Sequence, residues 1–178
     1  MQSLYEWDFR PQVLIVEIAK RNIAQFDAET DEEYISRTIK GVVKHLPEID
    51  PLIQEAAPEW PIEQIAVTDK TILRLATYEL LIEREVPPKV VINEAVELAK
   101  AFGSDNSSKF INGVLGTLYR NSDLPKEAEV DELLTVHERS EEEDEPSQKT
   151  AHVMPDNDDE LSKKNEKSKQ NGEENSKS

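Results

Sequence analysis

Apolar residues recur every three or four positions across most of the first 120 residues, and this spacing limits the fold more than any other feature. It places the apolar side chains on one face of each of several successive helices. No stretch alternates apolar and polar residues between glycine or asparagine turns, as the strands of a hairpin would. The spacing therefore predicts an all-α domain of about six or seven helices.

Helix-breaking and capping residues indicate where these helices begin and end. Pro11 is expected at the first position of a helix, and Thr68 at an N-cap. Pro47 and Pro51 predict a kink or a break. Gly103 is expected just after the last turn of a helix, where glycine is common. The predicted helices cover residues 11–25, 31–43, 48–56, 68–84, 88–102 and 107–119.

Acidic charge is concentrated toward the C-terminus. The chain has a formal net charge of −17, and residues 1–124 carry 21 acidic and 13 basic side chains. Residues 140–178 contain few apolar side chains and begin with an acidic run, so they cannot bury enough apolar surface to fold. We therefore expect a helical domain over residues 1–124 and a disordered acidic tail over residues 140–178. Residues 125–139 between them are expected to form a short helix or a linker, because Val130 and Leu134 have helical spacing.

The composition excludes several classes of function. The chain has no cysteine, which excludes disulfide scaffolds, thiolate metal sites and cysteine nucleophiles. The three histidines are far apart and no nucleophile elbow, P-loop or kinase signature occurs, so we expect no metal, no cofactor and no enzymatic activity. No apolar run is long enough to cross a bilayer and no signal peptide is visible, which favours a cytoplasmic protein with no membrane contact. The acidic charge argues against a free-standing, non-specific nucleic-acid binder.

Several strings of residues are typical of one protein family. In chain order they are LYEW at 4–7, LRLATYEL at 73–80, VP at 86–87, VVINEAVELAK at 90–100, FG at 102–103 and KFINGVL at 109–115. With these strings in this order, the chain resembles the NusB family of transcription antitermination factors over residues 2–120. The resemblance implies a fold of two small helical bundles packed together.

The resemblance also implies a function. NusB-like proteins pair with the small-subunit ribosomal protein NusE, bind boxA RNA with it, and join the antitermination complex of RNA polymerase that supports ribosomal RNA transcription. We therefore expect a boxA-binding heterodimer with NusE, and a monomer or homodimer when the protein is alone. One alternative is an interaction module that binds NusE or ribosomal proteins without appreciable RNA binding. Another is an enzyme domain, since NusB-like folds also begin ribosomal RNA cytosine methyltransferases, but no glycine-rich cofactor loop follows residue 124.

The N-terminus departs from the family pattern. NusB proteins usually carry an arginine-rich stretch ahead of the first helix that contributes to RNA contact, and here Met1 falls where that helix is already half formed. A two-turn helix without its first half is marginal in isolation. We therefore expect Met1 to be an internal methionine with a basic segment upstream of it. If Met1 is the start, each lost phosphate contact weakens RNA binding and flattens its salt dependence.

Five residues are candidates for RNA contact. Lys70 and Arg74 are four apart on one predicted helix, so their side chains share a face, and the resemblance places Arg74 on the RNA-facing surface. Lys109 and Phe110 begin the last helix, where backbone N–H groups and a cation can meet phosphate and a ring can stack on an unpaired base. Tyr5 can stack in the same way. The residues alone favour a solvated face for Lys70 and Arg74, and they allow core packing of both rings as readily as stacking.

Two polar residues complete the predicted site, and one glycine outside the site is assigned a packing role. Asn106 falls where the family often has an acidic residue beside the RNA path, although an ordinary N-cap would explain it equally well. Asp69 matches a position where NusB-like proteins meet NusE, and it is also suited to complement the dipole of a helix as an acid in the first turn. Gly113 is expected to permit a close approach between helices.

Overall fold

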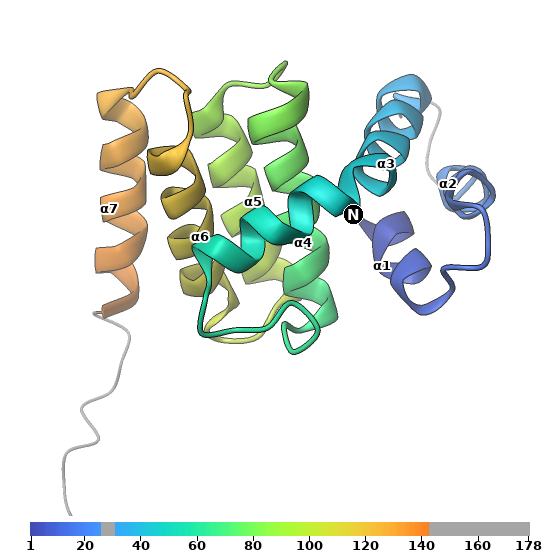
Figure 1. The fold of residues 1–178 in the computed structure, drawn as a ribbon, viewed down its shortest axis with the longest axis horizontal. Helices are drawn as coiled ribbons and strands as arrows, with labels where there is room; N and C mark the ends of the chain where they lie inside the picture. Colours follow the sequence, from blue (N-terminus) through green and yellow to red (C-terminus); the bar gives the residue numbers. More distant parts are fainter. Residues whose placement is uncertain (26–30, 143–178) are drawn as a thin grey trace, which may run out of the picture. The chain divides into compact units, whose positions relative to one another are not determined.

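Every regular element that the structure describes is helical, which confirms the predicted all-α class (Figure 1). The computed structural model describes residues 1–25 and 31–142, with side chains described as far as residue 136. None of the described helices combines the length and apolar character needed to cross a membrane. The elements are α1 (Gln2–Phe9), α2 (Ile15–Ile23), α3 (Glu32–Ala56), α4 (Val67–Thr77), the π-helical η1 (Tyr78–Glu83), α5 (Pro88–Phe102), α6 (Ser107–Asn121) and α7 (Ala128–Glu142).

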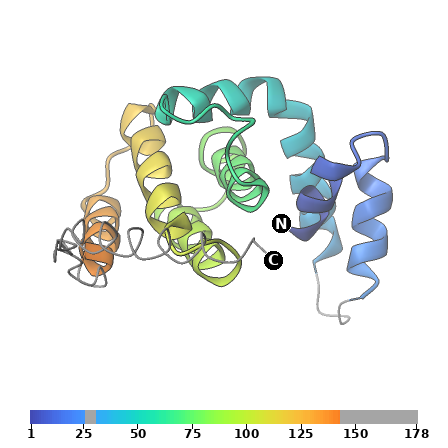
Figure 2. The ribbon, with the colours of Figure 1, turned by 90° about the horizontal axis from the view of Figure 1, so that it is seen from below.

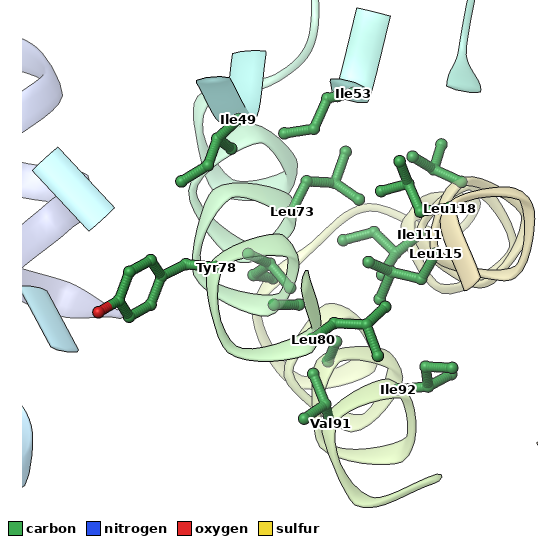
Figure 3. Packing of buried hydrophobic residues seen from close by; sticks show 14 of the residues in the cluster. Ile49, Ile53, Leu73, Tyr78, Leu80, Val91, Ile92, Ile111, Leu115 and Leu118 are labelled. Carbon is green, nitrogen blue, oxygen red and sulfur yellow. The ribbon is translucent and has the colours of Figure 1, made fainter. Parts of the chain in front are cut away.

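The two predicted bundles share the long helix α3. Helix α2 packs against α3 and α1 packs against α2 and α4, whereas α3 also packs against α4 and α6 of the bundle that holds α4, α5, α6 and α7 (Figure 1). Ile53 of α3, Leu73 of α4 and Ile111 of α6 point into one core in the second bundle (Figure 3). Their burial removes apolar surface from water, which is the main force that holds the helices together.

Helix α3 runs through both of its prolines, so the predicted break is wrong and the predicted kink is retained as a change of direction (Figure 2). Pro47 and Pro51 each remove one backbone hydrogen bond from the helix. Both prolines are exposed, so they lie on the side of the helix that faces water. Ile49 and Ile53 on the opposite side are fully buried, and this burial keeps the helix continuous.

Two predicted helix starts are wrong. Pro11 lies in a turn rather than at the first position of α2. The turn is closed by a hydrogen bond of 2.9 Å that Val13 N donates to Arg10 O. Proline is favoured at the second position of such turns because its φ is preset. At the start of α4 the N-cap is Ala66, whose carbonyl accepts from Lys70 N at 2.9 Å, so Thr68 lies inside the helix.

The helix predicted over 68–84 changes its winding at Tyr78. There α4 continues as η1, and Arg84 N donates to Glu79 O five residues back, at 2.9 Å. Arg84 then ends the element with φ 59°, a left-handed conformation that few residues other than glycine adopt. The Tyr78 ring packs against α3 at Gly41, where a Cβ atom would lie only 2.1 Å from the tyrosine oxygen. Glycine at this position is therefore required by the tyrosine.

The packed helices continue beyond residue 124 through α7, which covers most of the segment 125–139. Val130 and Leu134 are buried against α5 and α6. Asn112 of α6 donates its amide hydrogen to the carbonyl of Leu134 at 3.1 Å, and the buried Tyr119 donates its hydroxyl hydrogen to Pro125 O at 2.7 Å. The predicted disordered tail lies outside the described residues, except for the last helical positions of α7.

Candidate nucleic-acid interface

A hollow of about 300 Å³ opens where the loop before α4 meets the start of α6. Its walls come from the α3–α4 loop, the first turn of α4, the α5–α6 loop and the first turn of α6. Among its lining residues are three predicted site residues, Asp69, Asn106 and Phe110, which the fold brings together although up to 41 positions separate them in the chain.

Trp60 forms the wall opposite Phe110. The two rings meet edge to face with centroids 6.4 Å apart. Phe110 packs partly against the core. Core packing, which the sequence allowed as the alternative to RNA stacking, therefore accounts for one side of its ring. Trp60 is 53% exposed, which leaves an accessible aromatic surface beside Phe110. Sequence reasoning missed Trp60, although an aromatic residue between Pro58 and Pro61 in a polar loop is an available signal.

Lys109 and Gly113 border a second hollow of about 390 Å³ on the other side of the same pair of rings. Lys109 is exposed and has no ion-pair partner among the described residues. A Cβ atom at Gly113 would meet nothing within 4 Å, so the predicted close helix approach at this glycine is wrong. The close approach occurs at Gly116, where a Cβ atom would lie 3.1 Å from Leu134 of α7. Gly113 instead leaves open space beside Lys109.

Tyr5 borders a third hollow of about 300 Å³, together with Thr68 of α4 and Phe102 of α5. Tyr5 is 40% exposed and its ring meets Phe9 edge to face at 5.3 Å. Thr68 borders this third hollow and the next residue, Asp69, lines the first, so both hollows reach the first turn of α4.

The first and second hollows share Trp60 and Phe110, and the third reaches the same first turn of α4; we call the three hollows together the aromatic band. It is defined by its exposed or half-exposed aromatic rings and by the cation at its edge: Tyr5, Trp60, Phe102, Lys109 and Phe110.

Asn106 occupies the N-cap position of α6, but its side chain makes no capping hydrogen bond. The neighbouring Ser107 hydroxyl instead accepts from Ser104 N at 2.8 Å. Gly103 ends α5 as predicted, with an extended backbone, and a Cβ atom there would lie 2.4 Å from the Cβ of Ser107. The tight α5–α6 loop therefore depends on this glycine, and the amide of Asn106 is left to line the hollow.

Asp69 lies in the first turn of α4 with only 7% of its surface exposed. One of its carboxylate oxygens is buried and has no hydrogen-bond partner among the described residues. The position fits the helix-dipole interpretation, because an acid in the first turn complements the positive end of the helix. Only an edge of this side chain borders the hollow, so any contact with a partner is confined to that edge.

Lys70 and Arg74 lie apart from the aromatic band, in a cluster of four charged side chains that we call the α4 ion cluster. Asp8 of α1 is 3.1 Å from Lys70 Nζ and 2.8 Å from Arg74 Nη1. Arg74 also donates two hydrogen bonds to Asp50 of α3, at 2.8 and 2.7 Å. Burial by itself lowers the pKa of Arg74. The hydrogen bonds and negative charges of Asp50 and Asp8 outweigh this effect, so the pKa of Arg74 is raised above its ordinary value. The structure therefore does not support the simple solvated-face interpretation.

Five of the seven predicted site residues thus line the three hollows of the aromatic band, and the other two lie in the α4 ion cluster. Aromatic rings stack on unpaired bases of any sequence, and a cation beside them attracts phosphate. A surface of this kind is suited to single-stranded RNA. Phe110 and Tyr5 are the predicted members of it, and Trp60 and Phe102 are added by the structure.

The model of the NusB family matches residues 1–120. The transcription antitermination protein NusB of Chloroflexus aggregans is 44% identical over 120 residues, which cover 66% of this chain and 80% of that protein.

Solved structures of similar sequence share the fold. T. maritima NusB superposes with a TM-score of 0.64 at 35% identity, covering 69% of this chain and 87% of that one. The structure of antitermination factors NusB and NusE in complex with double-stranded RNA contains a chain that superposes with a TM-score of 0.61 at 27% identity. That match covers 67% of this chain and 89% of the other. Helix α7 lies beyond the residues that the family model matches.

Proposed function

The chain belongs to the NusB family, and from this premise we propose that it is a transcription antitermination factor that binds boxA RNA together with NusE. In this role it joins the antitermination complex of RNA polymerase, supports ribosomal RNA transcription in the cytoplasm, and has no enzymatic activity of its own. The related structure of NusB and NusE with RNA supports the choice of both partners.

The observation that carries the proposal is the aromatic band. Trp60 and Phe110 present neighbouring ring surfaces, and Tyr5 lies on the third hollow of the band. Stacking contributes about 1–3 kcal/mol per base in proteins that bind single strands. Lys109 borders the same hollow as Phe110, where it can pair with phosphate. Binding of RNA at the aromatic band therefore does not require contacts from the α4 ion cluster.

A basic partner compensates for the acidic charge of the chain. Residues 1–124 carry eight more acidic than basic side chains, and the aromatic band offers a single predicted cation, Lys109. Complementary charge speeds the encounter of protein partners, so an acidic NusB-like chain is suited to a basic ribosomal protein. We place the edge of Asp69 at this contact, because the resemblance assigns this position to the NusE contact and that edge borders the first hollow.

The proposal is tested by titrating fluorescently labelled boxA RNA with the full chain and the NusE protein of the same bacterium, and following the anisotropy. A scrambled RNA of equal length is the control. We expect salt-sensitive binding that favours boxA over the scrambled RNA by at least tenfold. Equal binding of both RNAs, with the NusE pair still forming, would reject the RNA part of the proposal and leave an interaction module.

A further inference from the structure

The α4 ion cluster joins three helices that are far apart in the chain. Asp8 comes from α1, Asp50 from α3, and both Lys70 and Arg74 come from α4. We infer that this cluster is a positioning device: it fixes α1 against α4, and so holds Tyr5 at the aromatic band without contacting RNA itself. The inference rests on the proposed function, because it assigns the cluster a role in that same RNA site.

The first argument is that the charges of the cluster are already matched. Two cations face two carboxylates, and all four side chains are largely buried, with Arg74 only 15% exposed. Arg74 uses Nε and Nη2 on Asp50 and Nη1 on Asp8. A phosphate group would have to displace a carboxylate that holds its partner in a two-pronged arrangement, which is the strongest geometry for such pairs.

The second argument is the location of the cluster. Arg74 lines a narrow crevice between α1, α3 and α4 together with Trp7, whereas neither Lys70 nor Arg74 lines any of the three hollows of the aromatic band. Lys70 follows Asp69 in the chain, but its Nζ atom turns to Asp8. Both cations are therefore directed toward the interior contact between helices rather than toward the band.

The third argument is that α1 depends on such contacts. It has eight residues, and a helix of about two turns does not persist on its own in water. Leu4 anchors its first turn in the core, and Asp8 ties its last turn to α4. Tyr5 lies between these two anchors, so the direction of its ring follows the direction of α1. Asp50 fixes Arg74 in turn, which gives Asp8 a rigid partner.

Substitution of Asp8 by asparagine separates positioning from direct contact, because the two roles predict opposite signs. Asp8→Asn keeps the shape of the side chain and removes one negative charge. If Lys70 and Arg74 touched phosphate, freeing them would tighten RNA binding. If the cluster positions Tyr5, Asp8→Asn leaves the Tyr5 ring less firmly held, and we expect the affinity for boxA RNA to fall about fivefold. The exposed Asp123→Asn, which removes the same charge at a distant site, is the matched control and should change the affinity by less than about twofold.

Two further readouts distinguish positioning from a general loss of structure. In a Tyr5→Ala background, Asp8→Asn should cause no further loss, because both substitutions act through the same ring. Lys70→Gln should leave the slope of log affinity against log salt unchanged, whereas the loss of a phosphate contact would reduce that slope by about 0.7 for a single strand. Additive losses, or a reduced slope, would overturn the inference.

The unbound protein provides a test that needs no RNA. Hydrogen exchange of the α1 amides should become faster in Asp8→Asn, while the amides of α5 and α6 keep their rates. Unchanged exchange in α1 would overturn the inference even if RNA binding were altered. If the wild-type chain shows no selective RNA binding at all, the proposed function fails and the inference falls with it; if the wild type binds and Asp8→Asn binds more tightly, only the inference fails.

Discussion

Substitution of Leu134 by alanine should destabilise the protein by about 2–3 kcal/mol, because α7 is part of the core rather than an appendage. Leu134 is 2% exposed, and one of its methyl carbons packs into the space that Gly116 leaves open on α6. The change removes three buried carbon atoms, which at about 0.8 kcal/mol each gives about 2.4 kcal/mol of lost transfer free energy. The cavity that remains adds to this figure, and partial collapse of the peripheral helix limits the addition.

Equilibrium unfolding in urea, followed by circular dichroism, measures this effect. With a slope of about 2 kcal/mol per molar urea, the midpoint should fall by about 1–1.5 M. Val136→Ala is the matched control, because it removes apolar atoms from the same helix at a side chain that is 52% exposed. It should shift the midpoint by less than about 0.3 M, as surface substitutions usually do.

The reasoning is refuted if Leu134→Ala and Val136→Ala give the same small shift. That result would mean that α7 does not bury Leu134 against α6, and that the stable fold ends where the sequence predicted, near residue 124. A large shift for both variants would also contradict it, because the effect would then not depend on burial.

Three other substitutions test the packing at two glycines and the titration of Tyr34. Gly41→Ala should destabilise the fold by about 2 kcal/mol in the same urea assay, because the new methyl group would meet the Tyr78 ring; Gly113→Ala, at an open helical site, should instead stabilise it by up to about 1 kcal/mol. Burial, together with the hydrogen bond that Tyr34 donates to Glu79, raises the pKa of Tyr34 above its ordinary value. The stability that depends on its proton is therefore complete below about pH 10 and is lost as the pH rises above it, because the unfolded chain releases this proton first. The fall in thermal unfolding temperature between pH 9 and pH 11 should be smaller in Tyr34→Phe than in the wild type, and an identical fall would reject the assignment.

Helical periodicity predicted the fold class because burial of one face is a local property of the sequence. The stripe of Ile111 and Leu115, for example, is visible in the sequence and is fully buried in the structure. The continuity of α3 through its prolines was not visible, because it depends on which side of the helix faces water. The π-helical turn at Tyr78 was missed for a similar reason: nothing in the local sequence shows that Gly41, on another helix, makes room for the ring.

The candidate site shows the same division between local and distant information. The spacing of Lys70 and Arg74 places both on one helix face, as their shared contact with Asp8 confirms. It does not show what that face meets, and the partners lie up to 66 positions away in the chain. Trp60 was overlooked because its importance comes from its position opposite Phe110, which only the tertiary fold creates.

The central claim is that boxA RNA lies on the aromatic band and not on the α4 ion cluster, and the two tryptophans of the chain test it most directly. Trp60 belongs to the band, whereas Trp7 lines the crevice beside Arg74. The nitrogen-15 resonances of the two indole N–H groups can be followed while boxA RNA is added to the complex with NusE, with scrambled RNA as the control. The account predicts that the Trp60 signal shifts selectively with boxA and that the Trp7 signal stays in place. A shift of Trp7 with an unchanged Trp60 would contradict it.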